Sequence, residues 1–289
     1  MSGKKPKEEV SEEIEKDEGE EIDQPDEPEK IKLEKTKDHT LDVASGTISG
    51  ELPAGYIDPD GVIHQTFVAQ EMTGHEEDIL AGTGKVMPRL NQVITNCLIS
   101  LGSITDRQQM SRAVSKMVAV DRIVILMAIR RVSLGDHWVR KIPCPKCDKE
   151  NNMNVNLASM DIVPMADPMK RRFETTLSSG KVVEWHIMSA EDEEWLSKKV
   201  KAQEDVLTLG LMARVDKIDD EELNRQREYK KALRTLKGLR LVERREIRKS
   251  TQENEGSVDT KVDFECDFCG AEWSAEMNLG HPDFFFPSE

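Results

Sequence analysis

The sequence is poor in aromatic and apolar residues, and it has no long hydrophobic run. Aromatic residues make up 4% of the 289 positions and hydrophobic residues 37%, whereas an average globular chain has roughly 45–50% apolar residues. Part of the chain is therefore not expected to join a packed core. No stretch approaches the ~18 apolar residues of a membrane helix, and the N-terminus lacks the apolar region of a secretory signal. We expect neither a membrane protein nor a secreted one.

The cysteine count and the charge exclude two further classes. Five cysteines, an odd number, do not suit a disulfide scaffold and indicate a reducing compartment. The 56 acidic residues outnumber the 41 basic ones and give a formal net charge of -15. Such a balance argues against a protein whose whole surface binds nucleic acid.

Much of the acidity lies at the N-terminus. Residues 1–40 hold 15 acidic residues, 8 lysines and no aromatic residue. Ordering a segment costs about 1–2 kcal/mol per residue, and this one has almost no apolar surface to offset that cost. We therefore expect a disordered acidic tail over residues 1–45, which serves either solubility or contact with a basic partner.

The rest of the chain uses one pattern twice, a hairpin followed directly by a helix. Alternating residues and a turn signal at residues 58–61 predict the first hairpin over residues 50–71. A second hairpin is predicted over residues 173–187, with its turn at residues 178–180.

Each hairpin runs into a capping signal. Thr73 is followed three residues later by Glu76, and Ser189 by Asp192, which is the spacing of a capping box. Further acidic residues in each first turn are stabilised by the positive end of the helix dipole. Helix capping therefore explains these acidic clusters better than acid–base catalysis does.

Three helices are predicted between the two repeats. Pro88 is expected at the first position of one, Asp106 caps the next, and Asp121 caps a third over residues 122–134 that ends at Gly135. The first of them has an apolar stripe typical of a buried helix face. The stripe consists of Leu90, Val93, Ile94, Cys97, Leu98 and Leu101.

A charged helical stretch is predicted over residues 219–249. Within it, residues 225–249 hold 11 basic residues and 3 acidic ones. Such a basic helix can be a solvated surface, can contact acidic protein segments, or can face nucleic-acid phosphates. The sequence leaves these alternatives open.

Four of the five cysteines form two Cys-x-x-Cys motifs, and each lies between two segments with strand character. Cys144 and Cys147 form the first motif, and Cys266 and Cys269 the second. A two-residue spacer lets both thiolates of a motif reach one ion, as in a zinc ribbon. We therefore predict one structural zinc with these four ligands.

The two halves of this predicted ribbon are separated by 118 residues, far more than the ~15–20 residues of a compact zinc ribbon. The second repeat would then be an insertion, and the metal would join distant parts of the chain. Four thiolates leave no open coordination position, so the site is expected to be structural. Redox-active pairs, disulfides and free thiols are less favoured alternatives, because neither motif opens a helix that would lower a thiol pKa.

Aromatic residues gather at the C-terminus, where the last 26 positions hold six of the 13. Neighbouring side chains of an extended segment point to opposite sides, so consecutive phenylalanines cannot all face one core. They either fold back onto the ribbon or anchor a partner, since aromatic side chains dominate many interfaces. The candidate docking residues are Phe284, Phe285 and Phe286.

Taken in order, several of these segments match a known pattern. The chain resembles the T-even-phage-type baseplate protein family, whose members include hub assembly chaperones of contractile tails. The resemblance covers residues 50–289. It rests on residues 72–80, the helix from Asp121-Arg122 to Arg130-Arg131, Gly135-Asp136, both Cys-x-x-Cys motifs and residues 282–287.

The resemblance implies a non-enzymatic role in assembling hub or tail proteins, either as a transient chaperone or as a retained virion component. It implies baseplate hub, spike or tail proteins as partners, in the host cytoplasm during assembly or in the tail baseplate. Members without cysteines exist, so the zinc prediction rests on the motifs of this chain.

We therefore predict an α+β protein with two hairpin-plus-capped-helix units, connecting helices and a split four-cysteine zinc ribbon. The alternative function is a nucleic-acid-binding zinc-ribbon module that uses the basic helix 225–249. An enzyme is not expected, because no catalytic motif is visible. The predicted segments are the tail 1–45, the first unit 46–140, the first half-ribbon 141–160, the second unit 161–258 and the second half-ribbon with the aromatic end 259–289.

Overall fold

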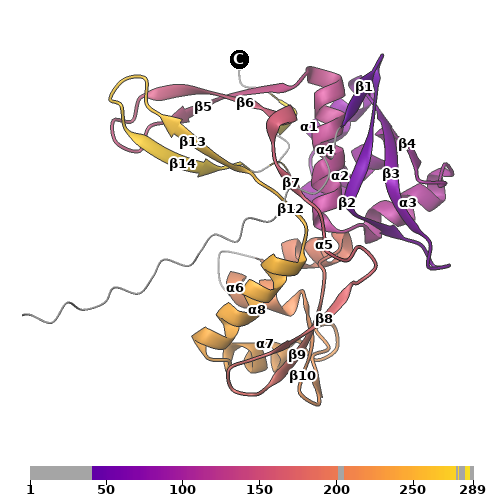
Figure 1. Ribbon diagram of the computed structural model, residues 1–289, viewed down its shortest axis with the longest axis vertical. Coiled ribbons are helices and arrows are strands. Elements are labelled where there is room, and N and C mark those ends of the chain that lie inside the picture. Colours follow the sequence, from indigo (N-terminus) through magenta and orange to yellow (C-terminus); the bar gives the residue numbers. More distant parts are fainter. Residues whose placement is uncertain (1–40, 201–204, 278, 280–283, 287–289) are drawn as a thin grey trace, which may run out of the picture. The chain divides into compact units, whose positions relative to one another are not determined.

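The computed structural model describes residues 41–200, 205–277, 279 and 284–286 (Figure 1). It has the α+β architecture that the sequence predicts, and every strand pair is antiparallel. Residues 1–40 of the predicted tail lie outside the described residues, and β1 (Asp42–Ala44) is the first described strand. None of the described helices is long and apolar enough to cross a membrane.

The first hairpin-plus-helix unit forms as predicted, within a four-stranded sheet of order β1-β2-β3-β4. The hairpin turn is fixed by Asp58, whose Oδ1 accepts the backbone N–H groups of Asp60 at 2.9 Å and Val62 at 2.8 Å. The capping box of Thr73 and Glu76 then starts the first helix. The elements after β1 are β2 (Thr47–Ile57), β3 (Ile63–Gln70), α1 (Gly74–Ala81), α2 (Val86–Cys97), β4 (Leu98–Leu101), α3 (Arg107–Lys116) and α4 (Ala119–Leu134).

Helix α2 differs from the prediction at both ends. It begins at Val86, so Pro88 is its third residue, which is tolerated because N–H groups of the first turn have no intrahelical partner. It ends at Cys97, and two apolar positions of the predicted helical stripe, Leu98 and Leu101, belong to β4. Both side chains remain buried in the same core, because β4 pairs with β3 at the edge of the sheet.

Helix α4 begins earlier than predicted. Its N-cap is Val118, so the predicted cap at Asp121 is wrong. Asp121 is instead fully buried, and its Oδ1 accepts the backbone N–H of Ala54 at 2.8 Å. This bond ties α4 to the part of β2 where pairing with β3 is irregular. The cap at Asp106 and the helix end at Gly135 are confirmed.

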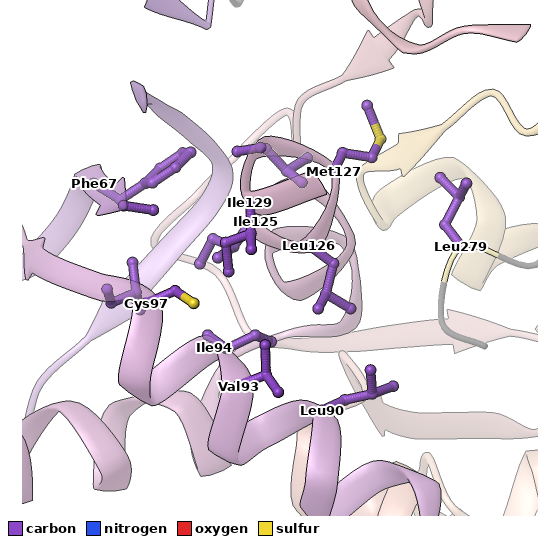
Figure 2. Packing of buried hydrophobic residues seen from close by; sticks show 14 of the residues in the cluster. Phe67, Leu90, Val93, Ile94, Cys97, Ile125, Leu126, Met127, Ile129 and Leu279 are labelled. Atoms are coloured by element: carbon purple, nitrogen blue, oxygen red, sulfur yellow. The ribbon is translucent and has the colours of Figure 1, made fainter. Parts of the chain in front are cut away.

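The larger core cluster combines α2 and α4 with the first sheet. Figure 2 shows the buried side chains Val93, Ile94 and Cys97 of α2 on the side that faces α4, near Ile125. Leu279, near the C-terminus, joins the same cluster. Full burial of an aliphatic side chain contributes about 1.5–3 kcal/mol, so this stripe fixes α2 even though its N-cap residue makes no side-chain capping bond.

The second hairpin-plus-helix unit also forms as predicted, in a sheet of order β11-β10-β9-β8. The capping box of Ser189 and Asp192 is present. Phe173 and Trp185, opposite each other on neighbouring strands, stack with ring centroids 4.7 Å apart. The elements are β8 (Arg172–Thr176), β9 (Val182–His186), α5 (Ala190–Lys199), α6 (Val206–Met212), β10 (Val215–Ile218), β11 (Glu221–Glu222), α7 (Tyr229–Lys237) and α8 (Leu241–Asn254).

Residues 219–249 do not form one helical stretch, so the predicted basic helix 225–249 is wrong as a single element. A turn at Asp219, with a left-handed φ of 51°, closes a β10–β11 hairpin. Two separate helices, α7 and α8, follow. Leu236 of α7 and Ile247 of α8 both enter the second core cluster.

Two further hairpins carry the cysteine motifs, and Figure 1 shows them beside each other although they come from distant parts of the chain. A short strand pair precedes the second hairpin and joins it to the segment that follows the first. The elements are β5 (His137–Pro143), β6 (Glu150–Asn156), the 3-10 helix η1 (Leu157–Ser159), β7 (Ile162–Val163), β12 (Ser257–Val258), β13 (Lys261–Glu265) and β14 (Glu272–Glu276).

Candidate metal centre

The two Cys-x-x-Cys motifs form turns of the same geometry. In each, the N–H of the first cysteine, Cys144 or Cys266, donates to the carbonyl five residues later at 2.9 Å. The N–H of the fourth residue after that cysteine donates to the carbonyl of the same cysteine, also at 2.9 Å. This fourth residue has a left-handed backbone in both turns, with φ 56° at Asp148 and 64° at Gly270. The two motifs are therefore equivalent half-sites.

The sulfur atoms of the four predicted ligands come together. Cys144 Sγ lies 3.8 Å from Cys269 Sγ, and Cys147 Sγ lies 3.7 Å from Cys266 Sγ. All four sulfurs lie within 4.8 Å of one another. A tetrahedral ion with metal–sulfur bonds of about 2.3 Å separates its ligands by about 3.8 Å, whereas a disulfide needs about 2.05 Å. The set therefore fits one tetrahedral metal ion.

The thiol pKa values differ within the site. Burial raises the pKa of Cys266, but the N–H groups of Phe268 and Cys269 and the neighbouring sulfurs outweigh it and lower the value to about 6. For Cys147, the N–H of Lys149 acts to lower the pKa, but burial and the other three thiols outweigh it and raise the value to about 12. Four thiolates at this spacing repel one another, so a bound cation is what would allow all four to ionise.

Two contacts outside the sulfurs hold the half-sites together. The Oδ1 atom of Asn151 on β6 accepts the N–H of Asp267 in the other motif at 2.9 Å. Lys149 places its Nζ 4.7 Å from the ring centroid of Phe268. Neither Asn151 nor Lys149 was predicted to belong to the site. Asn151 is buried and alternates with the buried Met153 on an otherwise apolar face of β6, and the signal in the sequence was this polar residue in an apolar alternation.

The fifth cysteine lies in the core, as predicted. Cys97 is 1% exposed, and burial raises its pKa to about 12. A thiol in this environment is a poor nucleophile and a poor ligand. Within the described residues, the four clustered cysteines form the one group of three or more His, Cys, Asp or Glu side chains that can hold a metal ion.

The structure places two of the three candidate docking phenylalanines in the chain's own core. Phe284 and Phe285 are 0% and 4% exposed, and Phe284 packs edge-to-face on Trp138 with centroids 5.1 Å apart. This is the fold-back alternative that the sequence left open. Phe286 packs against the same cluster while partly exposed, so its docking role stays a prediction.

Arg130 anchors this C-terminal segment, which the sequence did not predict. Its guanidinium is buried and donates to the carbonyl oxygens of Phe284 at 3.0 Å, Gly135 at 3.0 Å and His137 at 3.2 Å. Burial lowers the pKa of Arg130. Three carbonyl acceptors, two from the segment after α4 and one from the C-terminal segment, therefore compensate one buried cation.

A second cluster of titratable groups lies around His186 of β9. His186 contacts Asp216 at 2.9 Å and Asp192 at 3.3 Å, and Asp192 also accepts from Arg225. Burial acts to lower the pKa of His186, but hydrogen bonds to the two carboxylates outweigh it and raise the value to about 9. Arg225, one of the predicted basic residues, is therefore used in a network within the chain.

Other basic residues of the predicted basic helix also pair with carboxylates. Lys231 lies 3.2 Å from Glu221, and Lys237 lies 2.5 Å from Asp205. The break between α7 and α8 means that the continuous basic helix on which the nucleic-acid alternative depended is absent from the described residues. The ion pairs in addition neutralise part of its positive charge.

Comparison with known proteins identifies the family. The sequence model of the family described as "T4 bacteriophage base plate protein" matches residues 64–286. The match covers most of the chain and includes both cysteine motifs and the three phenylalanines. Searches of curated proteins and of solved structures gave no match. The chain belongs to the T4 bacteriophage base plate protein family.

Proposed function

We propose that the protein is an assembly factor or structural component of the baseplate hub, and that it acts through protein–protein contacts rather than catalysis. The observation that carries this proposal is the family match over residues 64–286. Membership supports a phage baseplate protein, which would be either a transient assembly factor or a component retained in the virion, and hub or spike proteins would be its partners. Its assembly would take place in the host cytoplasm, before or during incorporation into the tail.

We also propose that the four cysteines bind one zinc ion. Thiolates are the ligands that zinc takes in structural sites, and the sulfur spacing of 3.7 and 3.8 Å suits its tetrahedral geometry. With four protein ligands, such an ion has no position open to substrate. Its role would be to join the β5–β6 and β13–β14 hairpins, whose motifs are far apart in sequence.

A pull-down with purified baseplate hub and spike proteins from the same genome tests the assembly role. The tagged full-length chain should retain at least one of them at micromolar concentration. A Cys144→Ser variant, which removes one ligand, should retain less, because the second hairpin loses its attachment. A Cys97→Ala variant is the matched control for loss of a buried cysteine outside the site. Failure to form any complex with these proteins would contradict the proposed function.

A further inference from the structure

The two most exposed aliphatic side chains among the large apolar residues of the described chain lie in the second unit. Leu241, at the start of α8, is 82% exposed, and Leu207, in the first turn of α6, is 71% exposed. The neighbouring Val242 and Val206 are 47% and 40% exposed. Single exposed aliphatic residues are ordinary, but a contiguous group marks an interaction surface.

A direct bond between the two helices brings these residues near one another. Arg244 of α8, one turn after Leu241, donates from Nη2 to Thr208 Oγ1 at 2.9 Å. Thr208 is the residue directly after Leu207, and Figure 1 shows α6 and α8 next to each other. Each exposed leucine therefore lies within one helical turn of a residue that makes this bond. We call Val206, Leu207, Leu241 and Val242 the α6–α8 surface.

Positive charge lies along the α8 side of the α6–α8 surface, whereas on the α6 side Asp205 is paired with Lys237. Arg245 and Arg248 follow Leu241 at helical spacings of four and seven residues, so they lie on its side of α8. Neither takes part in any ion pair in the part of the chain that the structure describes. Arg240, next to Leu241, is 58% exposed and reaches Glu243 only at 3.5 Å. The surface thus has an apolar centre and a cationic rim.

We propose that the α6–α8 surface binds an amphipathic segment of another tail protein, with apolar side chains at its centre and carboxylates at its edges. This proposal rests on the proposed function and names the contact through which it works. The charge of the rim selects an acidic partner. The exposed leucines favour protein over nucleic acid, because phosphate groups offer no contact for an aliphatic centre.

Two sets of variants test the proposal on the full-length chain. The double variant Leu207→Ser/Leu241→Ser removes the apolar centre, and Arg245→Glu/Arg248→Glu reverses the rim. Met169→Ser is the matched control, since Met169 is 53% exposed outside this surface. Circular dichroism should give wild-type melting for all three. The probe is the purified hub or spike protein retained in the pull-down, with affinity measured by calorimetry at two salt concentrations.

The leucine variant is expected to weaken binding by at least about tenfold at both salt concentrations. The arginine variant should weaken binding most at low salt, and the control should bind as wild type does. A complex that forms equally well with the leucine variant would overturn this inference but leave the proposed function standing. Absence of any complex would contradict both.

Two other occupants of the surface are distinguished in the same experiments. Sedimentation that shows a dimer of the wild type, lost in the leucine variant, would mean that a second copy of the chain covers the surface. Binding of a DNA duplex that falls steeply with salt and with the arginine variant, but not with the leucine variant, would assign it to nucleic acid. Either result would overturn the proposal.

Discussion

Asp192 connects several elements of the second unit. It completes the capping box with Ser189, contacts His186 and accepts from Arg225. Burial acts to raise its pKa, but these partners outweigh it and lower the value well below that of an ordinary aspartate. One carboxylate therefore joins α5, β9 and the loop before α7, so a cap that the sequence predicted locally also has a tertiary role.

His186 predicts a pH dependence of stability. Its pKa is raised from 6.5 to about 9 by Asp192 and Asp216, so the charged form stabilises the fold fully below pH 6.5. That contribution is lost as pH rises through 9. We expect His186→Gln to lower the free energy of unfolding on the order of 3 kcal/mol at pH 6, and by much less at pH 10. Denaturant unfolding across this range measures the difference. An equal loss at both pH values would contradict this account.

Asp121 predicts a pH dependence of the same sign at lower pH. Burial raises its pKa from 3.8 to about 7, so the folded chain holds this proton more tightly than the unfolded chain does. Stability therefore falls as pH rises from about 4 to 7. The isosteric Asp121→Asn should remove this slope and raise the melting temperature at pH 8. Asp121→Ala is the comparison, because it also removes the acceptor of the Ala54 N–H and should destabilise at every pH.

At the scale of single elements, the sequence predicted best what local chemistry determines. Both hairpins and both capping boxes depend on residues within a few positions of one another, as with Thr73 and Glu76. The errors arose where tertiary packing decides. Leu98 continues the helical periodicity of α2, yet it lies in a strand because β3 offers backbone hydrogen bonds. Asp121 fits a cap by type, yet its partner is Ala54, 67 residues away.

The site was predictable for a similar reason. The two-residue spacing of each motif and the strand character around it indicated both half-sites. Their meeting across 118 residues could be inferred only from the need for four ligands. The contacts of Asn151 and Arg130 could not be predicted, because their partners come from distant segments whose approach depends on the whole fold.

The C-terminal segment is an element whose attachment can be tested at one residue. Arg130→Lys keeps the charge but loses the planar group that donates to three carbonyl oxygens. We expect a loss of about 2–3 kcal/mol in unfolding free energy and faster proteolysis near Phe284. Arg131→Lys is the control, since Arg131 lies on the same helix and its side chain pairs, within the described residues, with Asp136. Similar proteolysis of both variants would show that Arg130 does not anchor the segment.

At the scale of the whole molecule, the four-cysteine cluster brings together distant segments of a chain with a modest apolar content. The hairpins around it belong to parts of the sequence separated by the entire second unit. Besides the sulfurs, the Asp267–Asn151 hydrogen bond and the Lys149–Phe268 contact join the two motifs, and a tetrahedral ion would add to this attachment. Each hairpin carries two of the four cysteines, so neither hairpin alone can complete a tetrahedral site.

The metal content of the purified protein tests this account most directly. Protein prepared without chelators should contain one zinc ion per chain by elemental analysis and native mass spectrometry. Cys144→Ser and Cys266→Ser should lose the ion and melt at lower temperature, while Cys97→Ala keeps it. Wild-type protein without zinc, or cysteine variants that retain one ion per chain, would contradict the account.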